Sequence, residues 1–65
     1  MKTPNQMLEE ITGEMTDAAI LLELIYKNAQ SNTDRDGGIS CVIRSLLSTN
    51  EKAQGYIEEL RSASA

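Results

Sequence analysis

The chain has 65 residues with a net charge of −4, no histidine and a single cysteine. The acidic balance argues against a nucleic-acid-binding protein, which would be expected to carry a basic stripe. One cysteine excludes an internal disulfide and is typical of a reducing compartment, so we expect a cytoplasmic protein.

The same composition limits how so short a chain is stabilised. A domain of this size buries only about 60% of the surface that its unfolded chain exposes. Because disulfides and histidine-bound metals are both excluded, self-association or unusually good helix packing must supplement the core. The sequence has no signal-peptide pattern, and its longest apolar run, 18–26, is too short to span a bilayer, so we expect no membrane partner.

The first predicted element is a helix over about 4–30. Thr3 suits the N-cap, Pro4 suits the first helical position, and Gln6 completes the spacing of a capping box. Downstream, apolar residues recur at alternating steps of three and four, which predicts one stripe of helix packing. That stripe consists of Leu8, Ile11, Met15, Ala18, Leu22, Ile25 and Ala29.

The segment SNTDRDGG is the strongest helix-breaking cluster and predicts a hinge at 31–38. Asp34 or Asp36 is the expected N-cap of the next helix, because either carboxylate there also interacts favourably with the helix dipole. Gly37 and Gly38 would give the backbone the freedom that a tight reversal requires.

The second predicted helix covers about 39–62 and has two neighbouring lines of mostly apolar residues. One line consists of Ile39, Val42, Leu46, Thr49, Ala53, Tyr56, Leu60 and Ala63, and the other of Ile43, Leu47, Asn50, Gln54 and Ile57. Ser48 and Glu51 have capping-box spacing, so a break near 48–51 is the alternative to one unbroken helix. The favoured architecture is all-α, a single domain over 1–65 built as an antiparallel hairpin of two long helices.

The middle of the first helix is apolar on more than one side. Between 18 and 26 only Glu23 is polar, whereas one neighbouring helix can cover only one stripe. We therefore predict that two hairpins dimerise into a four-helix bundle, in which a buried Asn50 would fix the register. An amphipathic helix of another protein is the alternative partner. The expected dimer or partner interface consists of Ile20, Leu21, Leu24, Ile43, Leu47 and Ile57.

In length and layout the predicted protein resembles the small helical-hairpin dimers of the Rop type. The resemblance implies a closed, two-fold symmetric four-helix bundle. The basic face that an RNA-binding protein needs has no counterpart in this acidic chain, so RNA binding is not carried over.

Residues 32–40 resemble part of the calcium-binding loop of an EF-hand. Asn32, Asp34 and Asp36 occupy the first, third and fifth positions of that loop. The twelfth position is Ile43 instead of the glutamate that supplies two oxygens to calcium. A hinge is therefore the favoured interpretation, and a degenerate EF-hand-like calcium-responsive protein using Asn32, Asp34 and Asp36 is the alternative hypothesis.

Two other groups of residues have both a structural and a chemical interpretation. Glu10, Glu14 and Asp17 share one helix face, as carboxylate ligands do in metal-binding bundles, but without histidine a solvated acidic face is favoured. Cys41 lies away from the main packing stripe, and few cationic groups stand near it to activate the thiol.

With no general base or activated nucleophile, we expect no enzymatic activity, no cofactor and no bound metal. The favoured function is a small non-enzymatic structural or protein-interaction module that acts as a homodimeric helical bundle.

Overall fold

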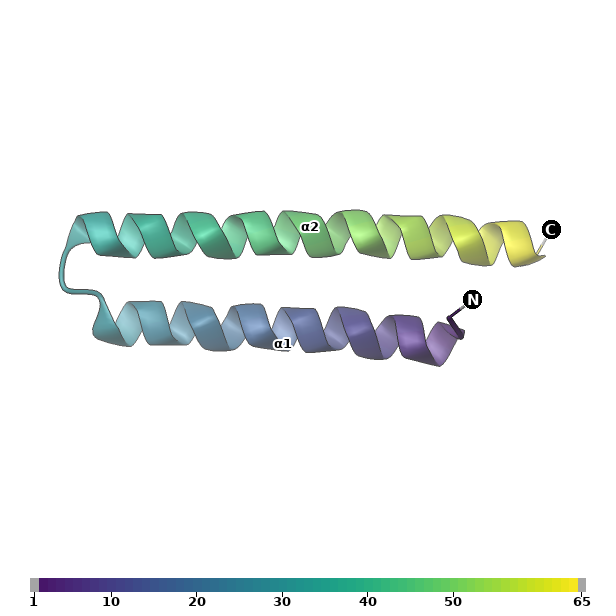
Figure 1. The fold of residues 1–65 in the computed structure, drawn as a ribbon, viewed down its shortest axis with the longest axis horizontal. Coiled ribbons are helices and arrows are strands. Elements are labelled where there is room, and N and C mark those ends of the chain that lie inside the picture. The colour runs from purple at the N-terminus through teal and green to yellow at the C-terminus, as the bar shows by residue number, and fades with distance from the viewer. Residues whose placement is uncertain (1, 65) are drawn as a thin grey trace.

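The computed structural model describes residues 2–64 and shows a hairpin of two antiparallel helices (Figure 1). Helix α1 covers Pro4–Asn28 and helix α2 covers Asn32–Ser64. The chain measures 51 × 16 × 12 Å, and among the described residues the two helices lie side by side with no third layer over them. These dimensions and elements confirm the predicted all-α helical hairpin.

Helix α1 begins at the capping box that the sequence predicts. The backbone N–H of Gln6 donates to Thr3 Oγ1 at 3.1 Å, and the backbone N–H of Thr3 donates to Gln6 Oε1 at 2.9 Å. The helix ends at Asn28, where Ala29 turns to extended backbone while its N–H still donates to the Ile25 carbonyl at 3.0 Å. Both ends of α1 therefore have their free backbone groups partly satisfied by local partners.

The start of the second helix differs from the prediction. Helix α2 begins at Asn32, so the expected hinge at 31–38 and the expected helix start near 39 are wrong. Ser31 caps this helix, because its Oγ accepts from the Asp34 N–H at 3.1 Å and its carbonyl accepts from the Arg35 N–H at 3.1 Å. The connection is only three residues long, 29–31, and the two glycines at 37 and 38 lie inside the helix.

Gly38 has a packing role in place of the predicted turn role. A Cβ built on Gly38 would lie 2.8 to 3.0 Å from three side-chain atoms of Ile25, whereas a Cβ on Gly37 would meet nothing within 4 Å. The missing side chain at Gly38 thus lets α2 approach α1 closely just beyond the connection. Further along, α2 runs without interruption through 48–51, so the capping-box spacing of Ser48 and Glu51 starts no new helix.

The core between the two helices is small. Its buried apolar residues are Met7, Ala18 and Val42. The packing stripe predicted for the first helix is only partly right, since Leu8 is 65% exposed and Met15 is 54% exposed. Helix α1 is rotated so that the residues preceding these two, Met7 and Glu14, face α2 instead. Many large apolar side chains consequently remain on the surface of the described chain.

Candidate interaction face

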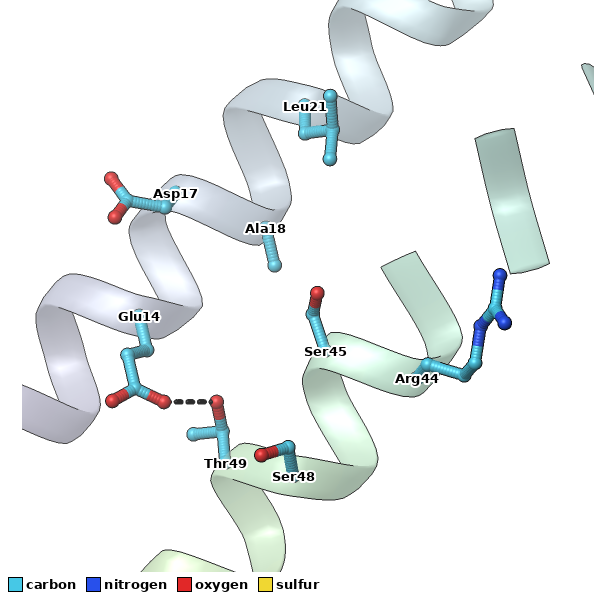
Figure 2. A pocket seen from close by; sticks show the side chains of 8 residues that line it. All are labelled: Glu14, Asp17, Ala18, Leu21, Arg44, Ser45, Ser48 and Thr49. Atoms are coloured by element: carbon cyan, nitrogen blue, oxygen red, sulfur yellow. Dashed lines mark hydrogen bonds between the residues drawn. The ribbon is translucent and has the colours of Figure 1, made fainter. Parts of the chain in front are cut away.

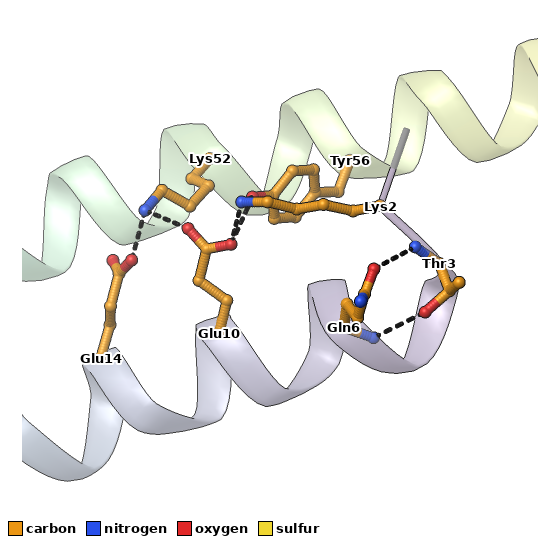
Figure 3. A network of polar contacts seen from close by, with 7 residues as sticks. All are labelled: Lys2, Thr3, Gln6, Glu10, Glu14, Lys52 and Tyr56. Carbon is orange, nitrogen blue, oxygen red and sulfur yellow. Dashed lines mark hydrogen bonds and ion pairs between the residues drawn. The ribbon is translucent and has the colours of Figure 1, made fainter.

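The two flat sides of the hairpin differ in chemistry, and one of them carries a polar network (Figure 3). From α2, Lys52 Nζ donates to Glu10 Oε1 at 2.7 Å and also forms an ion pair with Glu14. Thr49 Oγ1 donates to Glu14 Oε1 at 2.6 Å, and Tyr56 OH donates to Glu10 Oε2 at 2.8 Å. Two carboxylates of α1 are thus held by three side chains of α2.

Lys2 closes the same network from the segment before α1. Its ammonium forms an ion pair with Glu10 and donates to Tyr56 OH at 2.8 Å, and it lies 5.4 Å from the centre of the Tyr56 ring. Glu10 therefore accepts hydrogen bonds from both lysines and from the phenol. Sliding one helix past the other by a single turn would break these contacts together, so the network fixes the register of the hairpin.

The network shifts the titration of its members. Hydrogen bonds from Lys2 and then Lys52 lower the pKa of Glu10 to about 2. The hydrogen bond from Lys52 also lowers the pKa of Glu14. In return, the two glutamates raise the pKa of Lys52. All three groups are therefore ionised at neutral pH, where the network is complete.

Acid is expected to destabilise the hairpin through Glu10. Its pKa is lowered on folding from an ordinary 4.5 to about 2, so its contribution to stability is complete above 4.5 and is lost as the pH falls towards 2. At fixed protein concentration, the melting temperature of wild type should fall more steeply below pH 4.5 than that of Glu10→Gln. Glu9→Gln, which changes an exposed carboxylate outside the network, should keep the wild-type slope. Equal slopes for wild type and Glu10→Gln would contradict the role of Glu10.

A shallow groove lies on this polar side, further along the helices (Figure 2). Its lining includes Leu21 together with Glu14, Asp17 and Arg44. A second groove nearer the connection is lined by Leu24 with residues that include Asp34. Apolar side chains on this side, among them Leu21 and Leu24 one turn apart, are therefore mixed with charged ones. Among the described residues, no buried side-chain nitrogen or oxygen lacks a hydrogen-bond partner, and this holds for both grooves.

The opposite flat side carries a regular arrangement of apolar residues, which we call the apolar face. At about 100° per residue, Leu8 and Met15 lie on one side of the α1 contact line, and the glutamates of the network lie on the other. The apolar face consists of Leu8, Met15 and Leu22 from α1 and Ile43, Asn50 and Ile57 from α2. All six side chains are exposed.

Two grooves run between the helices on the apolar face. Leu8 and Ile57 line one of them, which has a volume of about 250 Å³. Met15 and Asn50 line the other, with a volume of about 230 Å³. Leu22 and Ile43 stand one further seven-residue step along their helices. The apolar face therefore consists of three pairs of residues across the two helices. The middle pair contains the side-chain amide of Asn50.

The predicted interface residues are divided between the two sides. Ile43 and Ile57 belong to the apolar face, and Leu47 lies at its outer edge by helical phase. Leu21 and Leu24 line the grooves of the polar side, and Ile20 lies on the outside of α1. All six predicted side chains are exposed in the single chain, but the structure does not bring them into one surface.

The residues of the EF-hand resemblance lie on a helix instead of in a loop. Asn32, Asp34 and Asp36 occupy the first turns of α2, and residues two apart on a helix point in nearly opposite directions. Among the described residues, no three His, Cys, Asp or Glu side chains are grouped so that they could hold a metal ion. Cys41 is exposed, and its Sγ accepts a hydrogen bond of 3.6 Å from Arg44.

Glu10 and Glu14 are the site residues that the sequence interpretation missed. They were expected on a solvated acidic face with Asp17, but they are partly buried against Lys52. A signal was present in the sequence: Thr49, Lys52 and Tyr56 follow one another at steps of three and four and can meet two glutamates four apart. That signal becomes readable only when the antiparallel pairing of the helices is known.

Comparison with known proteins assigns no family to this chain. No protein-family model, curated protein or solved structure matches it. Within the described range 2–64, neither helix is long and apolar enough to cross a membrane. The function therefore has to be proposed from the geometry of the chain's own residues.

Proposed function

We propose that the protein is a small non-enzymatic interaction module that acts as a homodimeric four-helix bundle, formed through the apolar face. The observation that carries this proposal is the imbalance between core and surface. Three apolar residues are buried in the described chain, whereas twelve large apolar side chains are exposed. Five of these exposed side chains are the apolar members of the apolar face, and a contiguous apolar patch on a monomer usually marks a protein interaction site.

The accessible surface of the chain supports a second copy as the partner. The chain exposes 5095 Å². A compact monomer of 7.1 kDa exposes about 4,100 Å², so the excess is about 1,000 Å². A stable protein interface buries about 800 Å² on each partner. One additional hairpin on the apolar face would therefore remove roughly the excess that the single hairpin exposes.

The chemistry of the face also favours a second copy over a different protein. Its apolar members are all aliphatic or methionine, whereas binding sites for foreign helices usually rely on anchoring aromatic residues. Homodimers with two-fold symmetry are the commonest assemblies, and they need a face that is complementary to itself. Stacking two hairpins face to face gives the layered packing of a four-helix bundle and leaves both polar networks on the outside.

The mass of the protein in solution tests this proposal. Light scattering coupled to gel filtration at micromolar concentration should give twice the 7.1 kDa of one chain. Circular dichroism on the same sample should show helix content in accord with two long helices. A folded, helical protein with the mass of one chain would contradict the homodimer.

A further inference from the structure

The apolar face has an internal symmetry that bears on how two copies pack. Leu8, Met15 and Leu22 are spaced seven residues apart on α1, and Ile43, Asn50 and Ile57 are spaced seven apart on α2. Residues at this spacing drift by only about 20° per step, so each set forms one row along its helix. Because the helices are antiparallel, the rows meet as the pairs Leu8 with Ile57 and Met15 with Asn50, as the two grooves show. Apolar pairs thus flank a central pair that contains one amide.

Asn50 is the only member of the apolar face with a polar side-chain group that both donates and accepts strong hydrogen bonds. Its side chain is exposed and makes no hydrogen bond with another residue in the part of the chain that the structure describes. Burial of an amide without a partner is unfavourable, so a protein that covers this face must offer Asn50 a matching group. A second carboxamide is such a group, since each can donate to the oxygen of the other.

We infer that, in the homodimer proposed above, the two-fold axis passes between Asn50 of one protomer and the partner's Asn50. The two connections then lie at opposite ends of the bundle, and α2 packs antiparallel to the partner's α2. Ile43 and Ile57 each stand seven residues from Asn50, so Ile43 faces the partner's Ile57. In the same way Leu8 faces the partner's Leu22, and the two central methionines meet.

The other two-fold arrangement would place both connections at the same end. Helix α2 would then pack on the partner's α1, and Asn50 would face the partner's Met15. A thioether is only a weak acceptor and cannot donate, so two amides would lose hydrogen bonds to water without replacement. One buried asparagine in an apolar helix interface commonly selects register and orientation in this manner, at a cost in stability. The self-complementary amide therefore selects the arrangement with the connections at opposite ends.

A distance between spin labels tests the arrangement. The label is attached at Gln30→Cys, an exposed position in the connection, in a chain carrying Cys41→Ser so that no other thiol reacts. Asn50 lies 18 residues from the start of α2 at Asn32. At 1.5 Å per residue that is about 27 Å, so the two labels should lie about 54 Å apart. With both connections at one end, the labels would lie within roughly 25 Å, since neighbouring helices are about 10 Å apart.

The variant Asn50→Leu tests whether the amide is the cause. It should keep the dimer mass and raise the melting temperature, but its label distances should split into a long and a short population. Asn28→Leu is the matched control, because it changes an exposed amide of α1 that lines a groove on the polar side and should leave one long distance. A single short distance in the otherwise wild-type dimer would overturn the arrangement without affecting the dimer proposal. A long distance that stays single in Asn50→Leu would overturn the role of Asn50, and a monomer mass would overturn the dimer itself.

Discussion

Replacing Ile57 with glutamate should convert the protein from a dimer to a monomer at micromolar concentration. Ile57 is 48% exposed in the single hairpin and lines a groove of the apolar face. In the dimer it would be covered, and by symmetry one substitution changes the interface twice. Since about half of Ile57 is already covered in the single hairpin, each copy loses roughly half of the 1.5 to 3 kcal/mol of complete apolar burial, and it must also desolvate a carboxylate. A total loss above about 4 kcal/mol weakens association by roughly a thousandfold or more.

Leu24→Glu is the matched control for this experiment. Leu24 is 52% exposed, but it lines a groove on the side of the hairpin that carries the polar network. The same charge at a similar exposure should therefore leave the dimer intact. Sedimentation equilibrium on both variants gives the two dissociation constants directly. A dimer that survives Ile57→Glu and dissociates with Leu24→Glu would place the interface on the other side.

Two neighbouring glycines should respond in opposite directions to the same substitution. At Gly37 a Cβ meets nothing within 4 Å, so Gly37→Ala should stabilise the helix by about 0.5 to 1 kcal/mol. At Gly38 the new Cβ would lie 2.8 to 3.0 Å from side-chain atoms of Ile25. Overpacking of this kind costs about 1 to 3 kcal/mol, which exceeds the gain in helix propensity. Gly38→Ala should therefore destabilise the protein.

Urea denaturation at one fixed protein concentration measures both effects as shifts of the transition midpoint. The mechanism is tested further in an Ile25→Ala background, which removes the atoms that the new methyl group would meet. There Gly38→Ala should stabilise the protein about as much as Gly37→Ala does. Equal stabilisation by the two glycine replacements in the wild-type background would show that α2 does not approach Ile25 so closely.

Local signals were sufficient to predict the hairpin but not all of its boundaries. The capping box at Thr3 and Gln6 marks the first helix correctly, because its partners are three residues apart. The glycines at 37 and 38 suggested a turn, yet Gly38 is needed for the contact with Ile25, which lies in the other helix. The start of α2 also has a local signal in the sequence. Ser31 and Asp34 have the spacing of an N-cap residue and the third residue after it.

The rotation of α1 about its axis could not be derived from its own sequence. Met7 and Leu8 are both apolar, so the periodic pattern fits either of them facing the second helix. The choice depends on Lys52, which pairs with Glu10 and Glu14 across the hairpin. That interaction joins residues about 40 positions apart, and the periodicity of one helix carries no information about it. The same rotation determines which apolar residues are left for the apolar face.

The small core has a consequence for the behaviour of the protein in a cell. Only Met7, Ala18 and Val42 are buried apolar residues within the described hairpin, so one copy alone has little to offset the entropy lost on folding. If the second copy supplies the rest, folding and association form one equilibrium, and the folded fraction depends on the total concentration of the chain. The melting temperature would then rise with protein concentration. Expression level would thus set how much of the protein is folded and how much is open to proteases.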